Sequence, residues 1–284
     1  MPTVSERSRL ISIVQSRQNA RVRELRAAFA QSGAEVSAVI GIEGEHLLAE
    51  ALRSGLGLRT VFVRADPDQR SLRRLERLEL PAAAPIVSLT PAVFASAVET
   101  ESPQGIAALV EAPRFSLAEM LSGPRPLVVI AAGLQDPGNF GTVVRSAEAF
   151  GASGVFALPG TVSLWNGKAL RASAGSAFRV PVIAEKSAAA FAALTEHNIP
   201  VLAAVPCSAD PEAVAATRAD LTGPVALLIG NEGAGLSAEL LDRANGRIAI
   251  PTPGPVESLN AAVAASILLY EAARQRRVGT EEGS

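Results

Sequence analysis

The 284-residue chain is poor in the residues that build redox, metal and base-stacking sites. It has one cysteine, Cys207, two histidines, one tryptophan and one tyrosine. A single thiol excludes an internal disulfide framework and suits a reducing compartment. Because His46, His197 and Cys207 do not have the spacing of zinc ligands, we expect no bound metal. Aromatic residues make up only 4% of the chain, which argues against a broad surface for stacking bases.

Long apolar runs and a strong net charge are also missing. The longest apolar run, 261–270, is shorter than the ~20 residues that a membrane-spanning helix needs. The N-terminus lacks the charged-then-apolar order of a signal peptide. We therefore expect a soluble, cytoplasmic protein with no membrane partner. The formal net charge of −2 gives no global sign of a nucleic-acid partner, so RNA or DNA binding would have to rest on local patches.

The first part of the chain predicts a small α/β domain over residues 1–111, beginning with an arginine-rich segment, 1–31. Apolar runs predict strands at 36–40, 59–64, 85–89 and 106–110. Periodic apolar residues predict helices at 45–54, 69–80 and 91–98. Prolines and a glycine over 112–126 predict a linker with room for a short helix.

The second part, 127–277, has a stronger alternation of strands and helices. We expect strands at 127–132, 154–157, 179–183, 200–205, 225–229 and 247–250. We expect helices at 141–150, 188–197, 237–244 and 259–276, followed by a flexible tail over 278–284. Near-continuous apolar strands between helices predict an α/β fold with a largely parallel sheet covered on both faces. The last helix places Leu259, Val263, Ile267 and Tyr270 on one stripe.

Three unusual loops follow apolar strands. In the most unusual one, 251–260, three prolines and a glycine within five residues hold backbone groups away from sheet and helix. The others are 136–141 and 230–235, both rich in glycine. Ligands of parallel sheets bind beyond the carboxyl ends of the strands. We therefore expect the three loops to meet at one edge.

Each loop also has a plainer interpretation. The first is a glycine-rich turn with Arg145 in a surface ion pair early in the next helix, and the second is a flexible turn with a solvated Glu232. In the third, Ser258 is expected to cap the last helix. Asn260 is then expected in its first turn, where asparagine is a mediocre helix residue. No strand is followed by G-x-G-x-x-G, and the chain has no Walker lysine motif.

The ordered set of loops carries a family resemblance. Residues 139–147 (Asn-Phe-Gly-Thr-Val-Val-Arg-Ser-Ala), 228–233 (Leu-Ile-Gly-Asn-Glu-Gly) and 250–260 resemble the three motifs of the SpoU (TrmH-like) RNA ribose methyltransferases of the SPOUT superfamily. The resemblance covers roughly 127–277. The N-terminal part resembles, more loosely, an L7Ae/L30e-like substrate-binding domain. One departure from the family motif is Thr252, where methionine is common after the Ile-Pro pair. We expect this difference to tune the affinity for the ligand without loss of function.

The resemblance implies a trefoil knot in the C-terminal domain, a homodimer with active sites at the interface, and S-adenosylmethionine as methyl donor. The usual rules of chain connection would not predict a knot. The implied catalytic residues are Asn139, Arg145, Glu232, Ser258 and Asn260. The implied cofactor-binding residues are Gly230, Ile250, Pro251 and Leu259.

The family assigns Arg145 a base-like role. A guanidinium stays protonated and is a poor base. We instead expect Arg145 to orient the ribose 2′-hydroxyl or a phosphate and to stabilise the developing negative charge, with Asn139 and Glu232 fixing the arginine and the ribose.

RNA affinity is expected from two basic stretches. One is the arginine-rich N-terminus with Arg17, Arg21 and Arg23, for which a solvated helix face is an equal alternative. The other holds Lys168 and Arg171, nearer the motif loops. The implied activity is methyl transfer to a ribose 2′-hydroxyl of 23S ribosomal RNA. Two alternatives stay open: the same reaction on tRNA, and an inactive RNA-binding paralogue in ribosome assembly.

Overall fold

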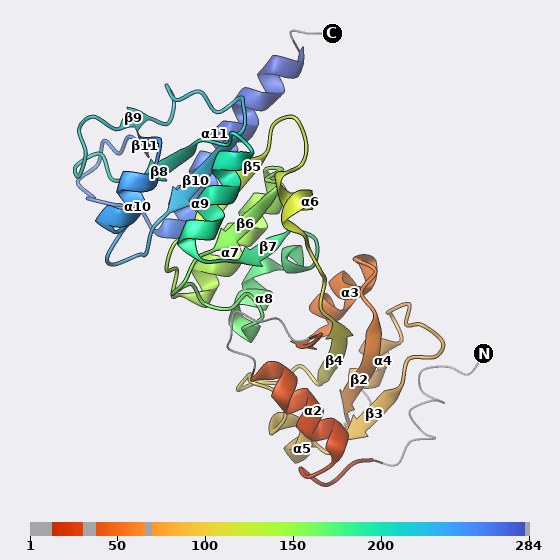
Figure 1. Ribbon diagram of the computed structural model, residues 1–284. Coiled ribbons are helices and arrows are strands. Elements are labelled where there is room, and N and C mark those ends of the chain that lie inside the picture. The colour runs from red at the N-terminus through yellow and green to blue at the C-terminus, as the bar shows by residue number, and fades with distance from the viewer. Residues whose placement is uncertain (1–12, 31–37, 66–69, 282–284) are drawn as a thin grey trace. The chain divides into compact units, whose positions relative to one another are not determined.

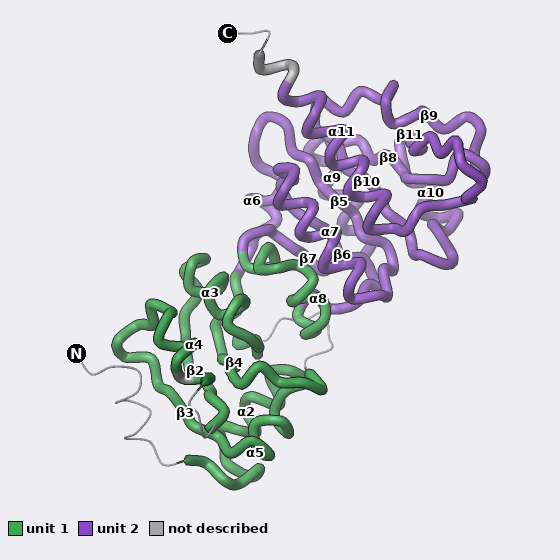
Figure 2. Tube along the Cα trace, turned by 180° about the vertical axis from the view of Figure 1, so that it is seen from behind, with its two compact units in different colours: residues 1–113, 165–178 green, residues 114–164, 179–284 purple. Residues whose placement is uncertain are grey.

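A computed structural model describes residues 13–30, 38–65 and 70–281, except for the side chains of 72 and 278–281 (Figure 1). The chain forms two compact units. Unit 1 comprises 1–113 and 165–178, and unit 2 comprises 114–164 and 179–284 (Figure 2). Unit 1 therefore takes a segment from the middle of the chain. Residues 1–12 and the start of the strand predicted at 36–40 lie outside the described residues.

Unit 1 is built on a mixed four-stranded sheet of order β1-β4-β2-β3. Its strands are β1 (Val39–Glu43), β2 (Leu58–Arg64), β3 (Ile86–Leu89) and β4 (Ile106–Glu111). Its helices are α2 (Ala20–Phe29), α3 (Glu45–Arg53), α4 (Arg70–Leu75), α5 (Pro91–Ala95) and α8 (Gly167–Ser173), followed by a 3-10 turn, η1 (Ser176–Phe178). Leu25 and Phe29 of α2 pack with Phe62 and Phe94 in its core.

Helix α8 was not predicted, because it is short and alanine-rich and has no periodic apolar stripe. Asn166 begins it, since the Asn166 side chain accepts hydrogen bonds from the backbone N–H groups of Lys168 (2.9 Å) and Ala169 (3.4 Å). Both α8 and α2 contact β1, which is an edge strand of the unit 1 sheet. Two helices from distant parts of the sequence therefore contact the same edge strand.

Unit 2 contains a seven-stranded sheet of order β7-β6-β5-β10-β8-β11-β9, and every pairing within it is parallel. Its strands are β5 (Leu127–Ala131), β6 (Gly154–Ala157), β7 (Val182–Ala184), β8 (Val201–Ala204), β9 (Val214–Ala215), β10 (Val225–Ile229) and β11 (Gly246–Ala249). Its helices are α6 (Leu117–Leu121), α7 (Pro137–Ala149), α9 (Ser187–Glu196), α10 (Ala238–Arg243) and α11 (Ala261–Glu281). The predicted α/β class and parallel sheet are confirmed.

Helices cover both faces of this sheet. Val128, Ile130 and Leu228 belong to a buried cluster that also holds residues of α6 and α9. Alternate residues of each strand point to the opposite face. There, α11 contacts both β10 and α7 (Figure 1). The trefoil knot implied by the family resemblance stays a prediction.

Two predicted boundaries in unit 2 were wrong. Helix α7 begins at Pro137 and not at residue 141, because the Asp136 side chain accepts from the N–H of Asn139 (2.8 Å) and proline suits the first helical position. The strand predicted from residue 179 begins at Val182, because the chain first makes the η1 turn and then pairs Arg179 with Glu148. The first glycine-rich loop is thus largely helical.

Two predicted connecting segments carry regular structure. Residues 112–126 include α6, which has a capping box between Ser116 and Glu119 and buries Met120 within unit 2. The tail predicted over 278–284 is helical as far as Glu281, and residues 282–284 lie outside the described part. Across the described residues, no helix is both long and apolar enough to cross a membrane.

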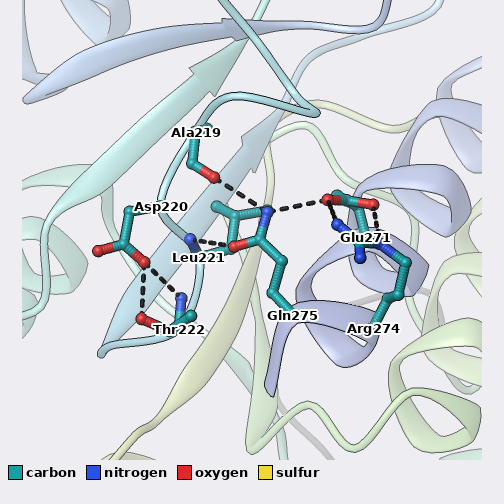
Figure 3. Close-up of polar contacts among 7 residues, drawn as sticks. All are labelled: Ala219, Asp220, Leu221, Thr222, Glu271, Arg274 and Gln275. Atoms are coloured by element: carbon teal, nitrogen blue, oxygen red, sulfur yellow. Dashed lines mark hydrogen bonds and ion pairs between the residues drawn. The ribbon is translucent and has the colours of Figure 1, made fainter. Parts of the chain in front are cut away.

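Hydrogen bonds join the C-terminal part of α11 to the loop that leads into β10 (Figure 3). Gln275 accepts from the N–H of Leu221 (2.9 Å) and donates to the carbonyl oxygen of Ala219 (3.0 Å) and to Glu271 (2.8 Å). Arg276 donates to the carbonyl oxygens of Leu221, Arg125 and Gly223. These bonds fix one end of α11 while its N-terminal end reaches the loops of the candidate site.

Candidate functional site

A cavity of about 390 Å³ lies at the carboxyl edge of the unit 2 sheet. Its walls come from residues that follow β8, β10 and β11, together with Ala261, Ala264 and Leu268 of α11. Cavities of this size hold small organic ligands. The predicted meeting of the second and third loops at one edge is therefore confirmed.

The second loop is tightly ordered by Asn231. The Asn231 side-chain oxygen accepts from the N–H groups of Gly233 (2.9 Å) and Ala234 (3.0 Å), and its Nδ2 donates to the carbonyl oxygen of Gly133 after β5 (2.7 Å). Two backbone hydrogen bonds join Asn231 to Gly235. Sequence reasoning missed Asn231, although an asparagine just before glycines is typical of an Asx turn. The structure thus shows a hydrogen-bonded turn here, with Glu232 exposed.

A chain of side-chain hydrogen bonds joins all three sequence motifs. Nδ2 of Asn139, on the first turn of α7, donates to Oε1 of Glu232 (2.8 Å). Nδ2 of Asn260 donates to Oδ1 of Asn139 (3.1 Å). The sequence separations are 93 and 121 residues. Three of the five predicted catalytic residues are therefore in direct contact.

Asn260, and not Ser258, caps the last helix. The Asn260 side-chain oxygen accepts from the N–H groups of Ala262 (2.9 Å) and Val263 (3.2 Å), and α11 begins at Ala261. Asparagine is a strong N-cap because its short side chain reaches those N–H groups. The expected positions of Ser258 as cap and Asn260 inside the first turn were wrong. Ser258 is exposed and lines the cavity.

Arg145 lies in the middle of α7, and not in its first turns as predicted. Its side chain is exposed and makes no hydrogen bond or ion pair with any residue that the structure describes. The surface ion pair of the plainer interpretation is thus absent from the described part. So is the expected hydrogen bond by which Asn139 or Glu232 would fix the arginine. The guanidinium keeps all its donors for an external group.

Three of the predicted cofactor-binding residues, Gly230, Ile250 and Leu259, line the cavity, and Pro251 is exposed beside Ile250. The Cys207 thiol, also on the cavity wall, donates to the carbonyl oxygen of Ile250 (3.4 Å). Sequence reasoning did not place Cys207 here, because its segment has no motif. The described residues contain no group of three or more His, Cys, Asp and Glu side chains that could hold a metal ion.

The residues predicted to contact RNA all lie in unit 1 and are all exposed: Arg17, Arg21, Arg23, Lys168 and Arg171. Arg21 and Arg23 lie on the outer face of α2, whose other face buries Val22 and Leu25. The two helices that carry four of these residues, α2 and α8, both contact the edge strand β1.

A sequence profile described as the SpoU rRNA Methylase family matches residues 126–270. The chain belongs to this family. A profile described as the MRM3-like substrate binding domain matches residues 19–108. The predicted family and the presence of an N-terminal substrate-binding domain are therefore confirmed.

Among curated relatives of this SpoU family member, the 23S rRNA (guanosine(2553)-2′-O)-methyltransferase RlmP of Bacillus subtilis is 33% identical, over 90% of this chain and 97% of its own. The 23S rRNA (guanosine-2′-O-)-methyltransferase RlmB of Xanthomonas campestris is 35% identical over 61% of this chain and 71% of its own.

Solved structures agree. The SpoU methyltransferase AviRb of Streptomyces viridochromogenes, in complex with AdoMet, superposes with a TM-score of 0.77 at 27% identity, over 92% of this chain and 99% of its own. An RNA 2′-O ribose methyltransferase gives a TM-score of 0.73 at 31% identity, over 94% and 100%. The likeness extends over both units and not the methylase part alone.

Proposed function

We propose that this protein transfers a methyl group from S-adenosylmethionine to a ribose 2′-hydroxyl of 23S ribosomal RNA. The observation that carries the proposal is the hydrogen-bonded set Asn139, Glu232 and Asn260 beside a cavity of about 390 Å³, in a chain of the SpoU family. It joins all three family motifs at one place. An inactive paralogue would have no reason to keep this set intact.

The cavity suits S-adenosylmethionine. Its lining is mainly apolar, with the backbone of the Gly230 loop on one side and Ile250 and Leu259 on the other, as a flat nucleoside with a polar tail requires. A complex of the relative AviRb with AdoMet supports the choice of ligand. When bound, the cofactor supplies a sulfonium methyl group that is already electrophilic. The protein then has only to position and polarise the ribose.

Arg145, Glu232 and Ser258 are the groups proposed to meet the ribose. The exposed Arg145 guanidinium orients the 2′-hydroxyl or the adjoining phosphate and stabilises negative charge on the oxygen. Glu232 accepts a hydrogen bond from the hydroxyl, and Ser258 lines the same cavity. Correct orientation of the two reactants adds a further large contribution to the rate.

Ribosomal RNA is the proposed substrate class. Both named relatives are called 23S rRNA guanosine 2′-O-methyltransferases, and these names support a guanosine in 23S rRNA. The arginines and the lysine of α2 and α8 are proposed to bind the phosphate backbone next to β1. Such contacts would position the RNA, while the target nucleotide is selected elsewhere.

We also propose that the protein works as a homodimer, as the resemblance implies. Val263, Ile267 and Tyr270 of α11 are 47%, 38% and 54% exposed, on one stripe. With Thr142 of α7 they border an apolar hollow. Exposed apolar side chains gathered on one helix are typical of a protein–protein interface, and a second copy is the proposed occupant.

Three measurements test the proposed reaction. Calorimetry should show S-adenosylmethionine binding at one site per chain. Labelled methyl groups should then be transferred to 23S rRNA that is isolated from cells without the gene. Mapping of 2′-O-methyl marks in cells with and without the gene should show one position lost where the gene is absent. Failure to bind the cofactor would contradict the enzyme, and labelling of tRNA alone would establish the tRNA alternative.

The RNA surface has its own test. The double variant Lys168→Ala/Arg171→Ala should bind 23S rRNA fragments more weakly. The slope of log K against log[salt] should become less steep by about one for each charge removed. Arg218→Ala removes an exposed arginine of unit 2 and is the matched control. An unchanged salt dependence in the double variant would remove α8 from the interface.

A further inference from the structure

The side-chain hydrogen bonds of the site all run from donor to acceptor in the same order, beginning at the backbone N–H groups of α11. The N–H groups of Ala262 and Val263 can only donate, so the atom of Asn260 that faces them has to be its oxygen. The other end of the Asn260 amide is then the NH2 group, which faces Oδ1 of Asn139. The helix end therefore fixes the orientation of the Asn260 amide.

The same reasoning fixes Asn139. Because Oδ1 of Asn139 accepts from Asn260, its Nδ2 is left to donate to Oε1 of Glu232. Flipping either amide would bring two donors or two acceptors together. Glu232, as a carboxylate, ends the series, because it only accepts. The order Asn260 to Asn139 to Glu232 thus has one polarity, which we call the amide relay.

The relay leaves Glu232 with one oxygen held and one available. Oε1 is bonded to Asn139, and the described residues offer no other hydrogen bond or ion pair to this exposed side chain. Glu232 also lines the cavity. A carboxylate held by one oxygen presents the other in a defined direction, where a hydroxyl group can donate to it.

We infer that Asn260 and Asn139 are positioning residues, which act by holding the Glu232 carboxylate beside the cavity, whereas the resemblance placed them among the catalytic residues. The inference rests on the proposed function, since Glu232 matters only if a ribose binds there. The relay also couples the N-terminal end of α11 to the site. A displacement of that end would move Glu232.

The alternative is that Asn260 is a helix cap and nothing more. Asparagine, aspartate and serine cap helices about equally well, so capping alone does not require an NH2 group. Asn260→Asp keeps the two cap bonds but cannot donate, and it turns a carboxylate oxygen toward Oδ1 of Asn139. Asn260→Ser keeps a cap and replaces the NH2 group by a shorter hydroxyl without adding charge. These two variants separate the cap from the relay.

The relay predicts the same result for both variants. Their thermal unfolding midpoints and their S-adenosylmethionine affinities by calorimetry should stay at wild-type values. Because misplacement by ~1 Å can cost ~100-fold in rate, kcat on 23S rRNA should fall by about 10- to 100-fold with little change in KM. Unchanged kcat in both variants would overturn the relay and leave Asn260 as a cap.

A double-variant cycle and a structure complete the experiment. If the residues act as one unit, Asn139→Ala should cost much less in kcat when Asn260 is already aspartate, and additive costs would contradict the inference. In a crystal structure of Asn260→Asp, the Asn139–Glu232 contact should be lost or lengthened, and an intact contact would contradict it too. The wild-type protein, measured alongside the variants, tests the proposed function itself. If the wild type does not bind the cofactor or does not transfer methyl groups, the proposed function fails whatever the variants show.

Discussion

The backbone of Gly230 lies against that of Gly235 with no space for a side chain. A Cβ atom on Gly230 would be 2.7 Å from the carbonyl carbon of Gly235 and 2.9 Å from Cγ of Leu236. Gly235 itself has a φ of +68°, in the left-handed region that favours glycine. The two glycines close the loop that Asn231 ties together and that forms one wall of the cavity.

Gly230→Ala should therefore displace this loop. We expect the unfolding free energy to fall by about 1–3 kcal/mol, as is usual for an overpacked site. We expect S-adenosylmethionine affinity to fall by at least about tenfold, measured by calorimetry, because the cavity wall moves. Gly254→Ala is the matched control, since a Cβ there meets no atom within 4 Å. Equal affinities in the two variants would contradict the proposed position of the cofactor.

Arg145→Ala should abolish methyl transfer while cofactor binding persists. The guanidinium is exposed and outside the cavity lining, so its loss should leave the S-adenosylmethionine affinity near the wild-type value. Loss of one preorganised charge-stabilising group typically lowers kcat by about 100- to 1,000-fold. Single-turnover transfer to 23S rRNA measures the effect, with Arg218→Ala as control. Normal turnover in Arg145→Ala would rule out its proposed role.

Ile267→Glu should prevent dimer formation. The substitution places a charge in the middle of the apolar stripe of α11, where a partner surface would have to desolvate it. Light scattering after size exclusion should give twice the chain mass for the wild type and the chain mass for the variant. Val214→Glu, on the 48% exposed Val214 of β9, should stay dimeric. A monomeric wild type would contradict the proposed interface.

Glu271 should make stability depend on acid pH. Its hydrogen bond with Arg274 holds the pKa of the carboxyl below its ordinary value of 4.5. The folded state therefore binds fewer protons than the unfolded state, and the stabilisation is complete above the ordinary pKa and is lost as the pH falls through the folded pKa. Glu271→Gln should lower the unfolding free energy by about 1 kcal/mol at pH 7.

Urea unfolding over the acid range measures this effect. The wild type and Glu271→Gln should converge as the pH falls below 4.5, because the wild-type carboxyl is then protonated as well. Glu239→Gln is the control. Glu239 pairs with Arg243 on α10, and 71% of the Glu239 side chain is exposed. Exposed ion pairs of this kind contribute little to stability. A constant difference between wild type and Glu271→Gln at all pH values would show that the charge is not responsible.

Much of the architecture could be predicted from local patterns. β6 lies at the predicted residues, and β10 does as well, because buried parallel strands are apolar throughout and end abruptly. Helix starts were harder to predict. Asp136-Pro137 is a recognisable start signal, but the glycines that follow it favoured a loop, and the tertiary contacts of α7 with α11 overrode that preference.

The sequence by itself determined the family, the α/β class and the parallel sheet, because these depend on residue type, order and apolar pattern. Only the tertiary structure decided that Asn139, Glu232 and Asn260 form one directed series of hydrogen bonds, that Asn231 joins the second loop to Gly133 after β5, and that α8 packs with unit 1. Such hydrogen bonds join residues 93 or more positions apart, and they depend on distance and angle in space, which no local pattern encodes.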